Sequence, residues 1–346
     1  MRRRILVFIA ACMYYSGLVA LARSLKRRDK KRVVVLNYHR ASGGHLRRHW
    51  LYLQRHYRIV PLEEALDEVY APDAQSNGDP RSPVVVTFDD GYRDNYTYAF
   101  PLASQLRVPF TIYLIPDYID SGDYFWWDEG KRLVQRARVS KVQLEGKVYR
   151  LSESQEVDEL SHLIDQRLRF APSVAERERF LTMVREALQA PSAVLPAEEP
   201  GMPLTWDEVR EMDASQLVSF GAHTLHHPVL SALTDPAEVR REIVDCKRVL
   251  EERLGHPVRS FAYPIGQMQH ISPEVVEAVR EAGYSWALTT RYGDNTPEAD
   301  PLLLHRVEAD IDQHWLVVAA EVAGLWGFFS RLRWIPFIRN RFTNSR

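Results

Sequence analysis

Two neighbouring carboxylates stand at the end of an apolar segment in the stretch VTFDDGY, residues 86–92. Asp89 and Asp90 follow three valines that read as a buried strand. Successive side chains on extended backbone point in opposite directions, so one carboxylate can bind a metal ion while its neighbour faces a substrate. Taken alone, the pair is more typical of a turn or a helix cap, where Asp and Gly are common.

Three histidines follow a second apolar segment, Leu217–Gly221, in the stretch HTLHHP. His223 and His227 are four residues apart, and their imidazoles can share one ion only if the chain turns, because four residues of straight strand span ~13 Å. Core or surface histidines are the alternative for this cluster alone. Together with the Asp pair at an equivalent strand end, the histidines indicate a metal site that acidifies a water, with the second carboxylate as general base.

The segments that must position these residues alternate between strand-like and helix-like patterns. This alternation predicts an α/β fold with a largely parallel sheet, whose carboxyl edge gathers the polar residues that follow the strands. The helices carry clear signals, such as Asp235-Pro236 at the start and Gly255 at the end of one of them. The expected strands are Val33–Tyr38, Val84–Phe88, Phe110–Ile115, Leu217–Gly221, Ser260–Tyr263 and Trp286–Thr289.

Composition narrows the class of protein and its domain organisation. The chain has 346 residues with a net charge of −1, which gives no global indication of nucleic-acid binding. It has two cysteines, Cys12 and Cys246, so we expect no disulfide framework. Residues about 128–200 are charged and helical in pattern, and end in a connector rich in Pro and Ala; we expect a helical insertion rather than a second catalytic domain.

Both ends of the chain indicate membrane lipid as a partner. Residues 5–22 are uncharged and apolar, with basic flanks on both sides, and we see no cleavage site after them. They predict a retained anchor that spans the bilayer or an interfacial helix that lies on it. The heavier basic flank is C-terminal, which favours the cytoplasmic face of a bacterial inner membrane, with the periplasmic face as the alternative. The segment Leu325–Phe342 mixes aromatic and basic residues and reads as interfacial or as a docked terminal helix.

Three ordered motifs resemble those of the polysaccharide deacetylases, carbohydrate esterase family four, which share the NodB homology domain. They are Thr87–Gly91, His223–Pro228 and Arg259–Gly266, within a region of similarity from Val33 to Val307. The resemblance implies a distorted, incomplete (β/α) barrel of the polysaccharide deacetylase type. It also implies Asp89 as general base and a divalent metal, usually zinc, held by Asp90, His223 and His227. His226 is then a neighbour of the site and not a ligand.

The same resemblance implies further roles. The backbone N–H of Tyr263 would be an oxyanion donor, and Arg259 would orient Asp89. Leu303-Leu304-His305 resembles the family motif whose His protonates the leaving amine, although Arg306 and Val307 follow where an Asp is common. We therefore expect His305 as the general acid, with a wall or surface role as the alternative.

Two aromatic or imidazole features stay open. His39, at the end of the first strand, is expected to pack in the site wall or to contact substrate. Trp126 and Trp127 are expected to line a sugar subsite or to pack in the core.

These inferences predict a membrane-associated, metal-dependent hydrolase that removes N-acetyl groups from N-acetylhexosamine units of an exopolysaccharide-type polymer or a lipid-linked glycan. The alternatives are a carbohydrate O-acetyl esterase with the same site and a non-catalytic glycan-binding relative. The expected organisation is a membrane-associated segment at 1–32, a catalytic domain at 33–310 and an amphipathic basic tail at 311–346.

Overall fold

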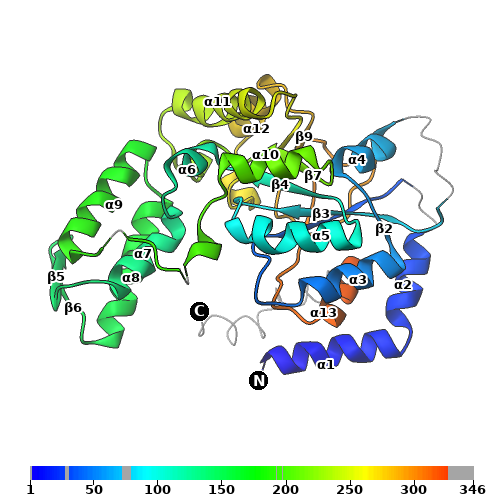
Figure 1. The fold of residues 1–346 in the computed structure, drawn as a ribbon, viewed down its shortest axis with the longest axis horizontal. Helices are drawn as coiled ribbons and strands as arrows, with labels where there is room; N and C mark the ends of the chain where they lie inside the picture. Colours follow the sequence, from blue (N-terminus) through cyan, green and yellow to red (C-terminus); the bar gives the residue numbers. More distant parts are fainter. Residues whose placement is uncertain (1, 28–30, 72–78, 192, 197, 326–346) are drawn as a thin grey trace.

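A parallel sheet forms the centre of the protein in a computed structural model that describes residues 2–27, 31–71, 79–191, 193–196 and 198–325 (Figure 1). The strand order is β10-β1-β3-β4-β7-β8-β9, with β2 beside β3, and every pairing in this sheet is parallel. Its strands are β1 Val34–Tyr38, β2 Arg58–Ile59, β3 Pro83–Phe88, β4 Phe110–Leu114, β7 Val218–Ala222, β8 Ser260–Ala262, β9 Trp286–Leu288 and β10 Val307–Glu308.

The expected α/β fold, with an incomplete barrel of parallel strands, is confirmed. The six strands expected from apolar runs are present, and their β-branched and aromatic side chains are buried on both faces of the sheet, as in other parallel sheets. The short β2 and β10 were not predicted, because two-residue strands carry no periodicity.

The last part of the sheet brings its two ends together. Leu304 forms a parallel bridge with Leu288 of β9, and three residues later Val307 pairs with Leu36 of β1. The segment between them therefore lies between the first and last strands of the barrel. Its side chains alternate between the interior and the outside of the barrel, so two neighbouring residues of this segment cannot both point into the interior.

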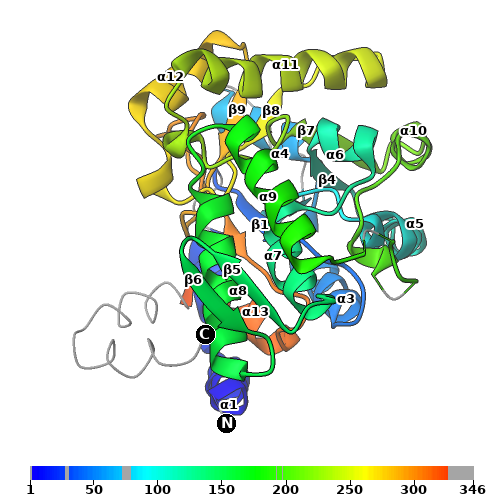
Figure 2. The ribbon, with the colours of Figure 1, turned by 90° about the vertical axis from the view of Figure 1, so that its left-hand side faces the viewer.

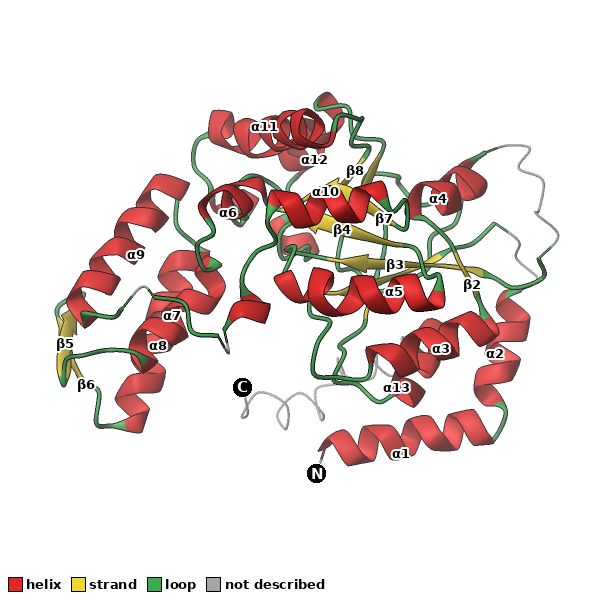
Figure 3. Ribbon diagram, viewed as in Figure 1, coloured by secondary structure: helices red, strands yellow, loops and turns green. Residues whose placement is uncertain are grey.

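Helices cover the sheet on both faces (Figure 3). One of them, α11 (Pro236–Leu254), begins and ends as expected: Asp235 accepts a hydrogen bond from the Ala237 N–H at 2.9 Å at its start, and Gly255 ends it with a φ of +78°. The helices that surround the sheet are α3 Leu46–His56, α4 Leu62–Tyr70, α5 Phe100–Leu106, α6 Pro116–Ser121, α10 Trp206–Ala214, α11 Pro236–Leu254 and α12 Pro273–Glu281. A π-helical turn, Asn95–Ala99, leads into α5, and 3-10 turns lie at Glu199–Gly201, Leu230–Ala232 and Met268–His270.

The insertion forms a lobe beside the carboxyl ends of the strands, with α7 Trp126–Gln135, α8 Ser154–Arg169 and α9 Val174–Leu188 (Figure 1). It has its own small core, which includes Leu133, Leu160 and Ile164. Besides these helices, the lobe contains an antiparallel hairpin of β5 Lys141–Leu144 and β6 Lys147–Arg150, which was not predicted from the sequence. The turn Glu145-Gly146 has φ values of +49° and +80°, a hairpin signal that the charged sequence obscured.

The N-terminal helix and the last described helix pack together below the sheet (Figure 2). α1, Arg2–Tyr15, lies along α13, Trp315–Val322, and a 67° bend separates α1 from α2, Leu18–Lys26. No single described helix is long and apolar enough to cross a membrane, whereas the bent α1–α2 pair meets that test by length and composition. α13 is buried, so the folded domain extends beyond the expected boundary at residue 310. The rest of the expected tail, residues 326–346, lies outside the described residues.

Candidate metal centre and active site

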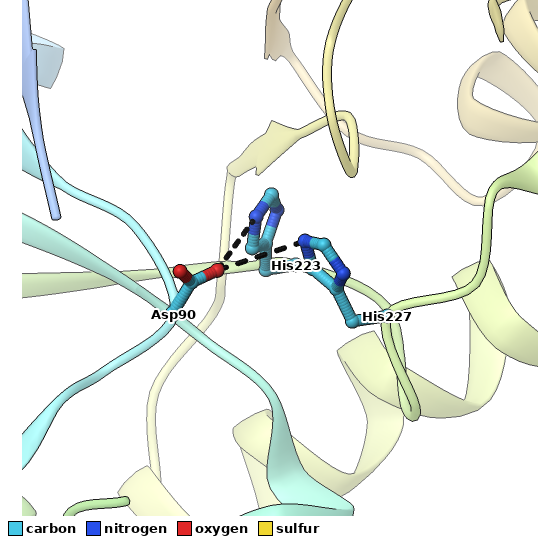
Figure 4. A group of neighbouring side chains, drawn as sticks. All are labelled: Asp90, His223 and His227. Carbon is cyan, nitrogen blue, oxygen red and sulfur yellow. Dashed lines mark ion pairs between the residues drawn. The ribbon is translucent and has the colours of Figure 1, made fainter. Parts of the chain in front are cut away.

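Three side chains from two strand ends meet at the carboxyl edge of the sheet (Figure 4). Asp90 follows β3, and His223 and His227 follow β7. Oδ1 of Asp90 lies 3.5 Å from Nε2 of His223 and 3.6 Å from Nε2 of His227, and all three side chains are buried. Ligands ~2.0–2.1 Å from one tetrahedral ion are ~3.4 Å apart, so this spacing fits a shared ion. These three residues can therefore hold a metal ion.

The turn that the histidine spacing requires is present. Thr224 and His227 adopt φ values of +65° and +54°, which fold the chain back immediately after β7. The hydroxyl of Thr224 accepts a hydrogen bond from the His227 N–H at 2.9 Å and holds the turn closed. Left-handed backbone is costly for residues with a Cβ, so the surrounding contacts must maintain it.

His226 provides some of those contacts and points away from the three ligands. Its Nδ1 lies 2.6 Å from Oε1 of buried Glu242, and its backbone N–H donates to Oε2 of the same residue at 3.0 Å. Its Nε2 lies 3.4 Å from Asp117. Burial opposes a charge on His226, but the two carboxylates raise its pKa to about 10. The prediction that His226 is a neighbour rather than a ligand agrees with this geometry.

The two histidines of this group differ in their hydrogen bonds and in the direction of their pKa shifts. Nδ1 of His223 donates to the carbonyl of Ala262 at 2.7 Å, which directs the lone pair of Nε2 towards Asp90. Burial alone would lower the pKa of His223, but the carboxylates of Asp90 and Asp89 raise it. Burial, with the neighbouring His223, lowers the pKa of His227 well below its usual value.

Asp89 lies beside this group and is paired with an arginine that the sequence analysis did not assign to the site. Nη1 and Nη2 of Arg306 donate to the two carboxylate oxygens of Asp89 at 2.7 and 2.9 Å, and Nε donates to the carbonyl of Thr289 at 2.9 Å. Both partners are buried. Burial would raise the pKa of Asp89, but the Arg306 guanidinium, assisted by His223, holds it at about 2.

The expectation that Arg259 orients Asp89 is therefore wrong. Arg259 immediately precedes β8 and lies at the amino edge of the sheet, where it pairs with Glu63 at 3.0 Å and Asp67 at 3.4 Å. Its side chain is 38% exposed. The geometry assigns the orienting contact to Arg306 instead.

Two further expected roles do not fit the structure. The N–H of Tyr263 donates to the carbonyl of Leu288 at 3.1 Å as part of the β8–β9 ladder, so it is not available to an oxyanion. His305 does not line the cavity at the site, because its Nδ1 lies 3.2 Å from the carbonyl of Asp294, on the other side of its segment from Arg306. These two predictions are corrected, and other groups must supply both functions.

A cavity of about 290 Å³ lies next to Asp90, His223 and His227. Its walls include Asp89, Asp90, both ligand histidines, His39 at the end of β1 and Ile265 in the loop after β8. Ile265 has a φ of +61°, and its carbonyl accepts a hydrogen bond from the Thr290 hydroxyl at 3.1 Å. His39 and Ile265 thus line the cavity together with the three residues that can hold a metal ion.

The insertion supplies the aromatic wall of the same cavity. The ring of Trp127 lies 4.4 Å from that of His227 between centroids, and its Nε1 donates to the hydroxyl of Tyr92 at 2.7 Å. Nε1 of Trp126 donates to the carbonyl of His227 at 2.9 Å. Trp126 is buried in the lobe, in agreement with the expected core packing, and both tryptophans line the cavity, where a sugar subsite stays a prediction.

The sequence profile of the polysaccharide deacetylases matches residues 76–287, which is more than half of the chain. The chain belongs to the polysaccharide deacetylase family. YxkH of Bacillus subtilis (strain 168), which is provisionally named a polysaccharide deacetylase, is 21% identical over 293 residues, 82% of this chain and 73% of YxkH.

Solved structures share the fold of this family member. IcaB from Ammonifex degensii superposes with a TM-score of 0.55 at 21% identity, over 85% of this chain and 98% of IcaB. The deacetylase domain of BpsB from Bordetella bronchiseptica gives 0.52 at 17% identity, over 82% and 97%. Streptococcus pyogenes PplD, in complex with acetate, gives 0.55 at 16% identity, over 84% and 98%.

Proposed function

We propose that this polysaccharide deacetylase family member is a metal-dependent hydrolase that removes N-acetyl groups from N-acetylhexosamine units of a polysaccharide or lipid-linked glycan and releases acetate. The observation that carries the proposal is the buried group of Asp90, His223 and His227 with the ionised Asp89 beside it, at the base of a cavity. The cavity volume, about 290 Å³, is at the small end of the range for ligand sites, which suits a single sugar unit.

A divalent ion on these three ligands, with zinc as the expected metal, would acidify a water and polarise the acetamide carbonyl. Asp89 accepts the proton of that water, because its carboxylate is ionised and lies beside the ligands. Arg306 holds both carboxylate oxygens of Asp89 and so fixes the direction in which the base faces. The bidentate contact also keeps Asp89 from turning towards the metal ligands.

The remaining two steps fall to groups in the cavity wall. The N–H of Ile265 replaces that of Tyr263 as the donor to the oxyanion, since Ile265 lines the cavity and its peptide is fixed by the neighbouring turn. His39 replaces His305 as the proton donor to the leaving nitrogen. The C–N bond then breaks, the water oxygen stays on the acyl carbon, and acetate and the free amine leave.

The location that we propose is the bacterial inner membrane, with membrane lipid as a partner in addition to the glycan. The apolar N-terminal helices and their basic flanks support this location. The charge bias favours the cytoplasmic face, and the periplasmic face is the alternative.

The test compares N-acetylated with O-acetylated oligosaccharides as substrates for the zinc-loaded protein. We expect acetate and free amine in equal amounts from the N-acetylated substrate, and no acetate release from Asp89→Asn, which keeps its metal. Acetate from the O-acetylated substrate alone would identify an esterase. Glycan binding without acetate release from either substrate would identify a non-catalytic relative.

A further inference from the structure

The first helix carries apolar side chains on two sides, and among the residues that the structure describes, protein covers one of these sides. One side of α1 carries Ala10 and Met13, which are buried. Ala10 packs against Leu316 and Val317 of α13. On the same helix, the ring of Tyr14 lies 5.1 Å from that of Trp315 in an edge-to-face contact.

The other side of α1 is a stripe of exposed residues at helical spacing: Ile5, Phe8, Cys12 and Tyr15. Phe8 is 69% exposed and Tyr15 is 75% exposed, and Leu18 continues the exposed apolar surface after the bend. We call this surface, from Ile5 to Leu18, the α1 stripe. A helix of a protein surrounded by water normally exposes polar residues on this side, so the stripe indicates a second apolar environment.

The charges around the stripe identify that environment. The helix pair itself has no acidic residue, since the first one in the sequence is Asp29, and Arg3, Arg4 and Arg27 lie near its two ends; Arg3 also lies 3.8 Å from the exposed Asp312. Basic residues at the ends of an apolar stripe match anionic lipid headgroups, and an exposed Tyr at its edge suits the interface between headgroups and acyl chains.

We infer that the α1 stripe lies in the plane of one leaflet of an anionic membrane while the opposite side of α1 stays docked on α13. α1 has 14 residues and is therefore about 21 Å long, which is shorter than the ~30 Å hydrocarbon core. To cross the membrane in line with α2, α1 would have to lose the 67° bend at Gly17 and leave α13, which would uncover Leu316 and Val317. In-plane binding keeps the bend between α1 and α2 and the packing of α1 on α13. The inference rests on the membrane part of the proposed function and is independent of deacetylation.

Cys12 is a natural reporter of depth. It is the exposed one of the two cysteines and lies in the middle of the stripe, whereas Cys246 is buried. We would label Cys12 of the full chain with an environment-sensitive fluorophore and add vesicles of phosphatidylcholine with phosphatidylglycerol. Lipids that carry a quencher near the headgroup should quench the label more than lipids with a quencher at the end of the acyl chain. Stronger quenching by the deep quencher would overturn the inference in favour of a spanning helix.

Matched variants test the face itself. Phe8→Glu should reduce flotation with anionic vesicles at least tenfold, while Val244→Glu, an equivalent change at an exposed apolar residue of α11 on the far side of the molecule, should not. Vesicles of phosphatidylcholine alone should bind more weakly. Unchanged flotation of Phe8→Glu would refute the inference, as would an α1 stripe buried in a dimer that Phe8→Glu dissociates. Acetate release from a soluble substrate should be equal in both variants, so failure of deacetylation is a separate result.

Discussion

The Asp89–Arg306 pair allows a sharp test, because sequence and geometry assign the same role to different arginines. Arg306→Met keeps most of the side-chain volume and removes the charge and the two hydrogen bonds to the carboxylate. Removing one partner of a buried ion pair costs ~3–5 kcal/mol, because the other charge stays buried without compensation. We therefore expect the free energy of unfolding to fall by roughly this amount at neutral pH.

The variant should also lose activity. Burial favours the protonated form of Asp89, and the guanidinium is the main group that opposes it. Without Arg306 the carboxyl group is protonated or misdirected, so the variant loses most of the ~10²–10⁴-fold contribution of a general base to kcat. Arg306→Lys restores the charge but not the two-point contact, and should recover part of the activity.

The control is Arg259→Met, which breaks the partly exposed pairs with Glu63 and Asp67. Such pairs are worth ~0–1 kcal/mol, so this variant should be nearly as stable and as active as the parent protein. The assay is the rate of acetate release from an N-acetylated oligosaccharide, with metal content measured in parallel. If Arg259→Met lost activity and Arg306→Met kept it at full metal content, the reasoning would be refuted.

Three other predictions use the same measurements. His39→Gln should lower kcat by ~10²-fold or more at full metal content, whereas His305→Gln should change it by less than about twofold; the reverse order would restore the sequence assignment. Glu242→Gln should weaken metal binding by ~10–100-fold, because the turn from His223 to His227 loses the hydrogen bonds of His226 to Glu242. Asp245→Asn on the same helix should leave metal binding unchanged, and metal titration measures both variants. Burial lowers the pKa of His49 to about 4 from 6.5, so the folded state loses stability as pH falls from 6.5 towards 4, by ~1.4 kcal/mol per pH unit; urea unfolding at pH 7 and pH 5 should show this loss, and His49→Gln should reduce it.

The three residues that can hold a metal ion were predictable from the sequence, because their side-chain types and their positions directly after strands can both be read from it. Asp90 follows the valines of β3, and the turn between His223 and His227 was a stated requirement of their spacing. Position relative to a strand also explains the error at Arg259. A residue that precedes a strand lies at its amino end, and the site is at the carboxyl end.

The error at His305 has a different cause. Residue type favoured the imidazole, but alternation along the segment from Leu304 to Val307 directs the neighbouring side chain inward. The available signal was Arg306 itself, a charged residue in an otherwise apolar run that ends in a strand. The N–H of Tyr263 failed as a prediction because a backbone donor is identified only by its partner, here Leu288, and sheet pairing over long sequence separation is not visible in the motif.

Metal titration tests the central claim most directly. The full chain, freed of metal with a chelator, is titrated with Zn²⁺ while binding and acetate release are measured together, and His223→Ala is treated in the same way. We predict one ion bound per chain, acetate release that rises with occupancy, and neither in the variant. Acetate release at the full rate from the metal-free protein, or undiminished zinc binding by His223→Ala, would contradict the account.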